Sequence, residues 1–406
     1  MRLTRGLIVI AITAIILPSF MTTSTAATKA GTPCSKVGNI SIASGKKFTC
    51  IKVGKKLIWN NGVAQKTTNK PTPQPSKSPT ILNYPTSSEI LKIDRLVESA
   101  FANAKPAQAT IDFQVGPGVE SAEIAAIAKA SLPSALVVAS AMNIELTTPM
   151  TIYIGNRDWL APKMPAGTWC SDPMMGVPGP ASAGFCGIST GVVFLSVDGY
   201  LEIDGKKITR NFSTIEDRHL VSMSFTHELI HVMQGEAAFK YAQTKGNYNP
   251  YWLSEGGANV GALMAQAHLH KIPYSQARVF IASYSSCIFN SKQAMLKDYI
   301  VSSGQNNVCG AYYDGFHWSE YLVASSNNLA SLIDLPKQNE KVGNELVWDP
   351  NNQAEFNLNK LALSLKYGYS INFEEFTTNA YSYAERSTAQ LLQWLNAKKS
   401  IYPPAK

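Results

Sequence analysis

Hydrophobic and polar positions follow different periods in different parts of this chain, and these periods predict its elements. Apolar residues recur at helical spacing over residues 87–104 and 121–142, which predicts two helices. Short β-branched and aromatic runs at 151–154 and 191–196 predict strands, and after residue 213 the spacing is mostly helical. Strands followed by helices indicate an α+β domain in two lobes, with a cleft between them and a mostly helical C-terminal lobe.

A small, basic, disulfide-containing β module is predicted at residues 28–64. Two strand-like runs flank Gly54-Lys55-Lys56, which is typical of a hairpin. The segment resembles the short modules with Cys, Lys, Gly and Trp at the front of some secreted bacterial proteins. Residues 65–80 are rich in Lys, Thr, Pro and Ser, which favours a semi-extended linker, and the main domain is expected over residues 81–406.

The first 27 residues have the pattern of a secretory signal peptide. A basic start with Arg2 and Arg5 precedes an apolar stretch at residues 7–20 and a small polar segment that ends at Ala27. The apolar stretch is short for a membrane span, so we expect cleavage near Ala27 and a secreted or cell-envelope-associated product. The alternative is an uncleaved anchor. No transmembrane span is expected in the mature chain.

Six cysteines also suit an exported chain, because disulfides persist outside the cytoplasm. Their order favours local pairs, although the sequence alone allows other connectivities. The pairs we expect are Cys34 with Cys50, Cys170 with Cys186, and Cys287 with Cys309. No CxxC pair occurs, which argues against thiolate zinc sites and thioredoxin-like redox chemistry.

The net charge of +8 is distributed unevenly. Residues 28–80 contain ten lysines and no acidic residue. Without Arg2 and Arg5 the chain carries +6, so residues 81–406 carry −4. A lysine-rich front end is attracted to anionic surfaces such as acidic cell-wall polymers, and no nucleic acid is expected among the partners. The alternative is a solvated spacer that aids solubility.

A helix that carries metal-binding chemistry is predicted after residue 213. Ser213 and Glu216 form a capping box, and Gly235 marks the C-terminal stop. Between them lies Thr226-His227-Glu228-Leu229-Ile230-His231, an HExxH sequence.

Four residues advance a helix by about one turn, so the His227 and His231 imidazoles share one face and can bind one metal ion. Glu228 is offset by one position and can instead take a proton from water at the metal. The alternative is two surface histidines beside a glutamate.

A catalytic zinc site needs a third protein ligand, and Glu255 is the candidate. Ser254 is the expected cap of a second helix, which puts Glu255 in its first turn, where the helix dipole favours an ionised carboxylate. Gly256 and Gly257 predict that this backbone approaches a neighbour closely, for which we suggest the His227 helix. The alternative is a helix-start carboxylate without a metal.

Over about residues 190–330 the chain resembles the gluzincins, which are HExxH zinc metallopeptidases with a Trp-Leu-x-Glu-Gly-x-Ala pattern on a second helix. Trp252-Leu253-Ser254-Glu255-Gly256-Gly257-Ala258 matches every fixed position. The resemblance implies a two-lobed zincin-like fold with a mixed sheet, zinc held by the two histidines and Glu255, and Glu228 as general base. It also implies that Asn259 orients a ligand imidazole; an ordinary buried Asn is the alternative.

Further along, Tyr312-Tyr313-Asp314-Gly315 resembles the Tyr-x-x-Gly segment of the same group, which implies that Tyr312 stabilises the oxyanion. Tyr313 or His317 could take that role instead. Residues 191–196 are expected to form the edge strand to which a peptide substrate adds. The Gly-x-Met-Glu-Asn signature of the aminopeptidase branch is missing, which favours an endopeptidase.

These patterns together favour a secreted zinc-dependent peptidase. One rival is a cell-wall-associated binding protein with an inactive peptidase-like fold, in which the N-terminal module does the work. Another is a zinc hydrolase of a non-peptide substrate, since HExxH chemistry needs only a carbonyl-like centre. His219, His268 and His270 have no such context and are interpreted as surface or packing residues.

Overall fold

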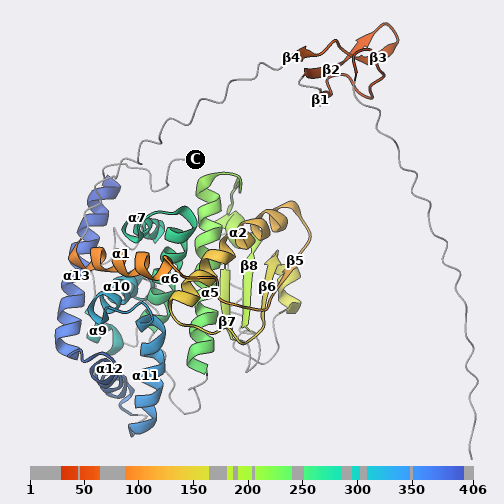
Figure 1. Cartoon of the computed structure of the whole chain (residues 1–406). Helices are drawn as coiled ribbons and strands as arrows, with labels where there is room; N and C mark the ends of the chain where they lie inside the picture. Colours follow the sequence, from red (N-terminus) through yellow and green to blue (C-terminus); the bar gives the residue numbers. More distant parts are fainter. Residues whose placement is uncertain are drawn as a thin grey trace, which may run out of the picture. The chain divides into compact units, whose positions relative to one another are not determined.

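The computed structural model describes residues 29–43, 46–64, 87–163, 181–185, 191–203, 206–239, 251–284, 295–301, 309–347 and 351–396. The predicted signal peptide, the linker at 65–80 and three of the cysteines (Cys170, Cys186 and Cys287) lie outside these ranges. The chain divides into two compact units, Met1–Ile81 and Leu82–Lys406, which are described separately below (Figure 1).

The first unit contains an antiparallel four-stranded sheet in which one strand pairs with the other three. The central strand is β2 (Lys46–Val53), and its partners are β1 (Ile40–Ala43), β3 (Lys56–Trp59) and β4 (Val63–Ala64). The predicted hairpin between β2 and β3 is confirmed, and Gly54 in its turn has a φ of 58° that glycine adopts readily. The predicted disulfide between Cys34 and Cys50 is also confirmed.

The second unit contains a mixed four-stranded sheet with the order β5-β6-β8-β7. Its strands are β5 (Ile111–Val115), β6 (Met150–Gly155), β7 (Ala181–Phe185) and β8 (Gly191–Ser196). The first three strands in that order are parallel and β7 is antiparallel. The expectation that residues 191–196 form an edge strand is therefore wrong, because β7 folds back and pairs along the outer side of β8.

Both faces of this sheet are covered. The helices α2 (Val119–Ala141) and α5 (Ile215–Phe239) pack on one face, where Ile152 and Ile154 of β6 enter the main core. On the other face a smaller cluster forms where Phe194 of β8 packs near Leu160 of α3 (Arg157–Leu160). Successive strand residues point to opposite faces, so a continuous apolar strand can supply both clusters.

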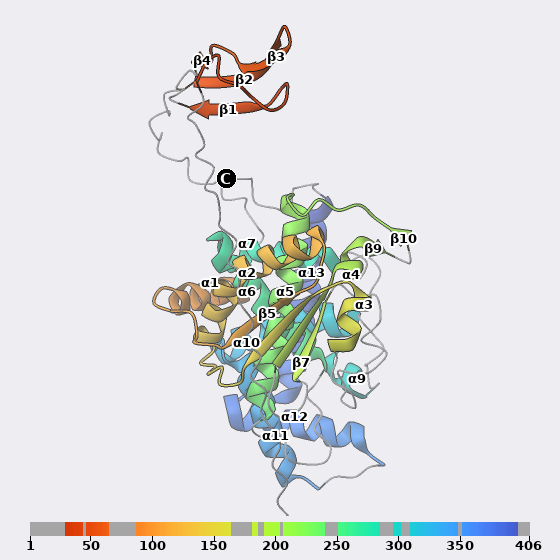
Figure 2. The same cartoon turned by 90° about the vertical axis from the view of Figure 1, so that its right-hand side faces the viewer.

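The remaining elements are mostly helical (Figure 2). The helix α6 (Tyr251–His270) lies between α5 and α10 (Gly315–Ser326) and packs against both. The other elements are α1 (Ser88–Phe101), η1 (Ala161–Lys163), α4 (Val197–Leu201), β9 (Glu202–Ile203), β10 (Lys206–Lys207), α7 (Tyr274–Ala277), η4 (Arg278–Tyr284), α9 (Leu296–Val301), η5 (Cys309–Asp314), α11 (Ser331–Glu345), α12 (Gln353–Tyr369) and α13 (Phe373–Asn396). The predicted α+β class is confirmed at this level.

Both helices of the predicted site begin at other residues than expected. The α5 helix begins at Ile215, and Thr214 rather than Ser213 caps it, since the Asp217 amide donates to Thr214 Oγ1 at 3.2 Å. It continues past Gly235 to Phe239, so Gly235 is not a stop. The α6 helix begins at Tyr251, so Glu255 lies in its second turn and the first-turn dipole argument does not apply to it.

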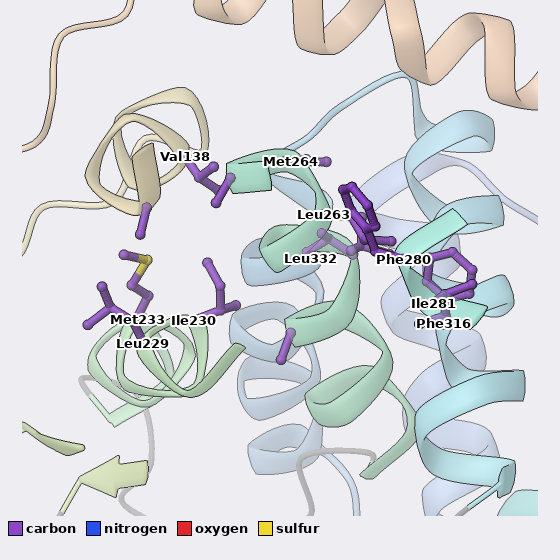
Figure 3. Packing of buried hydrophobic residues seen from close by; sticks show 14 of the residues in the cluster. Val138, Leu229, Ile230, Met233, Leu263, Met264, Phe280, Ile281, Phe316 and Leu332 are labelled. Atoms are coloured by element: carbon purple, nitrogen blue, oxygen red, sulfur yellow. The ribbon is translucent and has the colours of Figure 1, made fainter. Parts of the chain in front are cut away.

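The core of the second unit joins α2, α5 and α6. Figure 3 shows Val138 of α2 above Leu229 and Met233 of α5, and Leu263 of α6 beside Leu332 of α11. A buried polar link crosses the same three helices, because Ser222 Oγ lies 2.7 Å from Ser131 Oγ and 2.8 Å from Gln266 Nε2. Among the described helices, α2 alone has the length and apolar composition of a membrane span, and 56% of its most apolar stretch is buried in this core.

A buried ionic network holds the C-terminal helix against the core. The Glu320 carboxylate on α10 accepts hydrogen bonds from Arg278 Nε at 2.7 Å, Tyr274 Oη at 2.8 Å and Tyr383 Oη at 2.7 Å. Arg278 also donates to Ser387 on α13. The charges of Glu320 and Arg278 are paired with each other, so no buried charge in this network lacks a partner. The hydrogen bonds of the network connect α7, η4, α10 and α13.

Candidate metal centre

Three side chains from two neighbouring helices converge at one point. His227 and His231 come from α5, and Glu255 comes from α6, which runs beside it (Figure 1). The two Nε2 atoms are 3.0 Å apart, and each lies 3.2 Å from Glu255 Oε2. Within the described ranges, this is the one group of three His, Cys, Asp or Glu residues whose ligand atoms come this close, and it could hold a metal ion.

The orientation of each imidazole is set by a side-chain amide on its far side. His227 Nδ1 is 2.9 Å from Asn259 Oδ1, and His231 Nδ1 is 3.0 Å from Gln234 Oε1. Each amide is oriented in turn by backbone carbonyls: Asn259 Nδ2 donates to Tyr312 O at 2.9 Å, and Gln234 Nε2 donates to Leu253 O at 3.2 Å. Carbonyl groups only accept, so the amide oxygens must face the imidazoles.

This arrangement determines the tautomer of both histidines. An amide oxygen accepts a hydrogen bond, so Nδ1 carries the proton in each ring and Nε2 of the neutral ring presents a lone pair. The Nε2 lone pairs of His227 and His231 and the carboxylate oxygen of Glu255 then point at one another. These electron-rich atoms repel one another unless a cation or a proton lies between them. Ligands about 2.0–2.1 Å from a tetrahedral zinc ion are about 3.3 Å from each other, close to the separations in this group.

In the absence of a metal, the electrostatics of the group favour a proton in its place. Burial disfavours the charged form of His231, but the nearby carboxylate of Glu255 outweighs burial and raises the pKa of His231 to about 9. Burial would raise the pKa of Glu255, but the two histidines lower it well below its ordinary value. The site is therefore built to hold a positive charge beside Glu255.

Close contact between helix backbones positions Glu255. A Cβ on Gly256 would lie 2.1 Å from the carbonyl carbon of Gly315, the first residue of α10. A Cβ on Gly257 would lie 3.0 Å from Gln234 Nε2 on α5. The expectation that both glycines face the His227 helix is thus correct for Gly257 and wrong for Gly256, which faces α10. The α6 helix is packed between two neighbours, and its ligand has little freedom to move.

Glu228 lies between the two histidines in sequence, and its side chain is partly exposed. Its charge is one of the causes that raise the pKa of His231. Burial chiefly, and the charge of Glu228 in addition, raise the pKa of the Tyr200 phenol on α4. The negative charge of Glu228 therefore acts on both His231 and Tyr200.

The three oxyanion candidates differ in position. The Tyr312 ring stacks beside the His227 ring, with centroids 5.8 Å apart, and Tyr312 is partly exposed. Tyr313 is buried, and its hydroxyl lies 3.0 Å from Thr388 Oγ1 on α13. His317 is buried too, with Nε2 3.4 Å from the same Thr388 oxygen, and burial lowers its pKa well below 6.5. Of the three, Tyr312 lies next to a candidate ligand.

Gln234 is the residue of this site that sequence reasoning missed. It follows His231 by three positions, so it lies on the same helix face, and that spacing is the signal that could have identified it. The sequence predicts a surface or packing role for His219, and the packing role is confirmed. His219 is buried and packs on Phe280, with ring centroids 4.2 Å apart.

The structure describes one of the two cysteines in the predicted disulfide between Cys287 and Cys309. Cys309 is disulfide-bonded, and its predicted partner lies outside the described ranges.

Comparison of the chain with protein-family models, with curated proteins and with solved structures yields no match.

Proposed function

We propose that this chain is a zinc-dependent peptidase of the gluzincin type, with a zincin-like main domain, exported from the cell. The observation that carries the proposal is the convergence of the Nε2 atoms of His227 and His231 on Glu255 Oε2, with both rings held in one tautomer by amide oxygens. The HExxH sequence and the Trp252-Leu253-Ser254-Glu255-Gly256-Gly257-Ala258 match support it.

The donor set and the HExxH spacing together favour zinc among common metal ions. Two neutral imidazoles and one carboxylate are borderline and hard donors in a three-ligand set, which is typical of catalytic zinc sites that leave a fourth position open. Calcium and magnesium prefer oxygen ligands. Non-haem iron also uses two histidines and one carboxylate, and the HExxH sequence on one helix is what favours zinc over iron. His227, His231 and Glu255 would hold the zinc ion, which would lower the pKa of a bound water and polarise a carbonyl oxygen of the substrate.

Glu228 is the proposed general base. It would accept one proton from the attacking water and pass it to the nitrogen of the leaving amine as the C–N bond breaks. The water oxygen stays on the carbonyl carbon, and the resulting carboxylic acid releases its proton at neutral pH. Asn259 and Gln234 hold the imidazoles in the ligating tautomer throughout. Tyr312 is the proposed donor to the developing oxyanion, because its ring lies beside His227 while the other two candidates face α13.

The outer side of β7, which pairs with no other strand within the described ranges, is the proposed site for the substrate backbone. This antiparallel strand is at the edge of the sheet and packs beside α5, the helix of the two histidines. An extended peptide can pair with an edge strand through main-chain hydrogen bonds, and this pairing does not require a free amino or carboxyl terminus on the peptide. Together with the missing aminopeptidase signature, this geometry favours internal peptide bonds.

A metal-dependent digest tests the proposal. The purified secreted chain is expected to contain zinc and to cleave a broad mixture of peptides at internal bonds, with activity lost to a chelator and restored by zinc. Cleavage of esters or other carbonyl compounds, but of no peptide, would favour a non-peptide hydrolase. A zinc-loaded chain inert toward all of these substrates would favour a binding protein with an inactive fold.

Two substitutions separate the roles of the site residues. Glu228→Gln is expected to lower turnover by about a thousandfold with zinc still bound, because only the base is lost. Glu255→Ala is expected to lower the zinc content itself. The matched control is Glu216→Gln in the first turn of the same helix, which is expected to leave both unchanged. Full activity of Glu228→Gln, or full zinc content of Glu255→Ala, would contradict the assignment.

A further inference from the structure

The sheet of the N-terminal unit has two chemically different faces, which the strand register defines. On β2, Phe48 and Cys50 point to one side, and Thr49, Ile51 and Val53 point to the other, because side chains alternate along a strand. The pairing extends this division to the neighbouring strands, because residues directly opposite each other share a face. The side that carries Phe48 is called the inner face below, and the side that carries Ile51 is called the outer face.

The inner face contains the packed part of the unit. Phe48 and Cys50 are buried there, and Cys50 is bonded to Cys34. The loop before β4 closes over Phe48, since a Cβ on Gly62 would lie 2.7 Å from that ring. The apolar side chains of this face are therefore used for folding.

The outer face leaves apolar side chains in solvent. The exposed fractions are 58% for Ile40, 38% for Ile51, 52% for Val53 and 68% for Val63. These residues come from β1, β2 and β4, and Thr49 and Ile58 complete the face through their pairing with Ile40 and Ile51. Single exposed aliphatic residues are common, but four on one face of a small sheet indicate a contact surface.

Positive charge surrounds this apolar face. Lys47 pairs with Val63 and Lys56 pairs with Val53, so both lysines also point to the outer face. Every lysine among the described residues of the unit is exposed, and the segment from residue 28 to residue 80 contains no acidic residue. These lysines are Lys29, Lys36, Lys46, Lys47, Lys52, Lys55 and Lys56.

We propose that the outer face binds the surface of an anionic lipid membrane and thereby keeps the exported chain at a bilayer. Aliphatic side chains enter the boundary between headgroups and acyl chains, while lysines at the same face meet the anionic headgroups. A purely polar anionic polymer would satisfy the lysines but leave the Ile and Val side chains in water. A second copy of the unit would bring lysines against lysines, which opposes pairing.

Sedimentation of the complete secreted chain with lipid vesicles tests this surface. Vesicles that contain phosphatidylglycerol are expected to bind the chain, and vesicles of phosphatidylcholine alone are expected to bind it weakly or not at all. Binding should weaken at high salt because the electrostatic part is screened. The proposal does not depend on peptidase activity, so a failure here leaves the proposed function untouched.

Paired substitutions test both components of the surface. Ile51→Thr with Val53→Thr keeps β-branched side chains but removes apolar area, and should lower vesicle binding about tenfold. Its control, Val119→Thr with Val347→Thr, removes two exposed aliphatic residues from the other unit and should change nothing. Lys47→Gln with Lys56→Gln should lower binding by about fivefold per lysine. The same change at Lys46 and Lys52, whose side chains point to the inner side, should lower it less.

Several outcomes would overturn the proposal. These are the absence of binding to anionic vesicles, equal binding to neutral vesicles, and unchanged binding of the Ile51 and Val53 variant with its disulfide intact. If soluble polyphosphate binds tightly, and the Ile51 and Val53 substitutions leave its affinity unchanged, the lysines bind a polar anionic polymer instead. Lipid-free dimers that the Ile51 and Val53 substitutions dissociate would assign the face to a second copy.

Discussion

A side-chain amide orients the imidazole of each candidate metal ligand. Asn259 and Gln234 are amides rather than carboxylates, so they fix the tautomer of His227 and His231 without adding negative charge. Each amide also bonds a backbone carbonyl of another element: Asn259 reaches Tyr312 on η5, and Gln234 reaches Leu253 on α6. The position of the candidate metal ligands is thereby coupled to α6 and η5.

Replacing Gln234 tests this coupling. Gln234→Leu removes the acceptor for His231 Nδ1, so its zinc affinity is expected to fall by about 10–100-fold in titration calorimetry. Gln234→Glu retains an acceptor for His231 Nδ1 but loses the donor to Leu253 O, so its affinity is expected to lie between those of Gln234→Leu and the wild type. Gln266→Leu is the control, because Gln266 is a buried amide that bonds Ser222 and lies outside the site. Wild-type affinity of Gln234→Leu would show that the imidazole needs no such support.

At the scale of elements, α6 connects the two parts of the site. It carries Glu255 and Asn259, and it packs against α5 on one side and α10 on the other. The contact with α10 has no room for a side chain at Gly256 or Gly315, since a Cβ at either position would meet backbone atoms of the other helix. Small residues permit this approach, and the approach sets where Glu255 lies relative to the histidines.

Gly256→Ala should therefore destabilise the fold. Its Cβ would meet the backbone of Gly315, which cannot rotate away as a side chain could, so we expect a loss of about 3 kcal/mol in urea unfolding. Gly368→Ala in α12 is the control, because its Cβ would lie 3.5 Å from Gln338 Cγ, an ordinary contact. That substitution should be neutral or stabilising by up to about 1 kcal/mol. Equal stability of the two variants would refute the tight α6 to α10 contact.

At the scale of the whole molecule, the chain consists of a basic N-terminal unit and a larger main unit. Buried polar groups affect the stability of the main unit. His219 is one such group: it packs on Phe280 and His270, and burial lowers its pKa to about 3. In the unfolded chain a histidine has a pKa of about 6.5. The unfolded state therefore binds a proton that the folded state does not over the interval between these values, and acid favours unfolding there.

The contribution of His219 is expected to be fully present above about pH 6.5 and to be lost as the pH falls toward about 3. Between pH 7 and pH 5 this amounts to about 2 kcal/mol of the unfolding free energy, measured by urea titration at each pH. His219→Phe keeps a ring against Phe280 but cannot titrate, so its stability should fall less steeply with acid. Comparison of both proteins at pH 8, where the histidine is neutral, separates the packing effect. Parallel pH profiles would contradict this role.

Local features of this protein can be predicted from its amino-acid sequence. Helical and strand periods, the hairpin around Gly54, the pair Cys34 and Cys50, and the two histidines one turn apart all depend on residues near one another in the chain. Other features follow from packing between distant segments: β7 lies at the sheet edge, Gly256 faces α10, and Tyr312 lies beside His227. The contact of Gln234 with His231 depends on the same packing, because α6 orients the Gln234 amide. The reason is that local propensity acts over a few residues, whereas these relations arise when packing brings α5, α6 and α10 together.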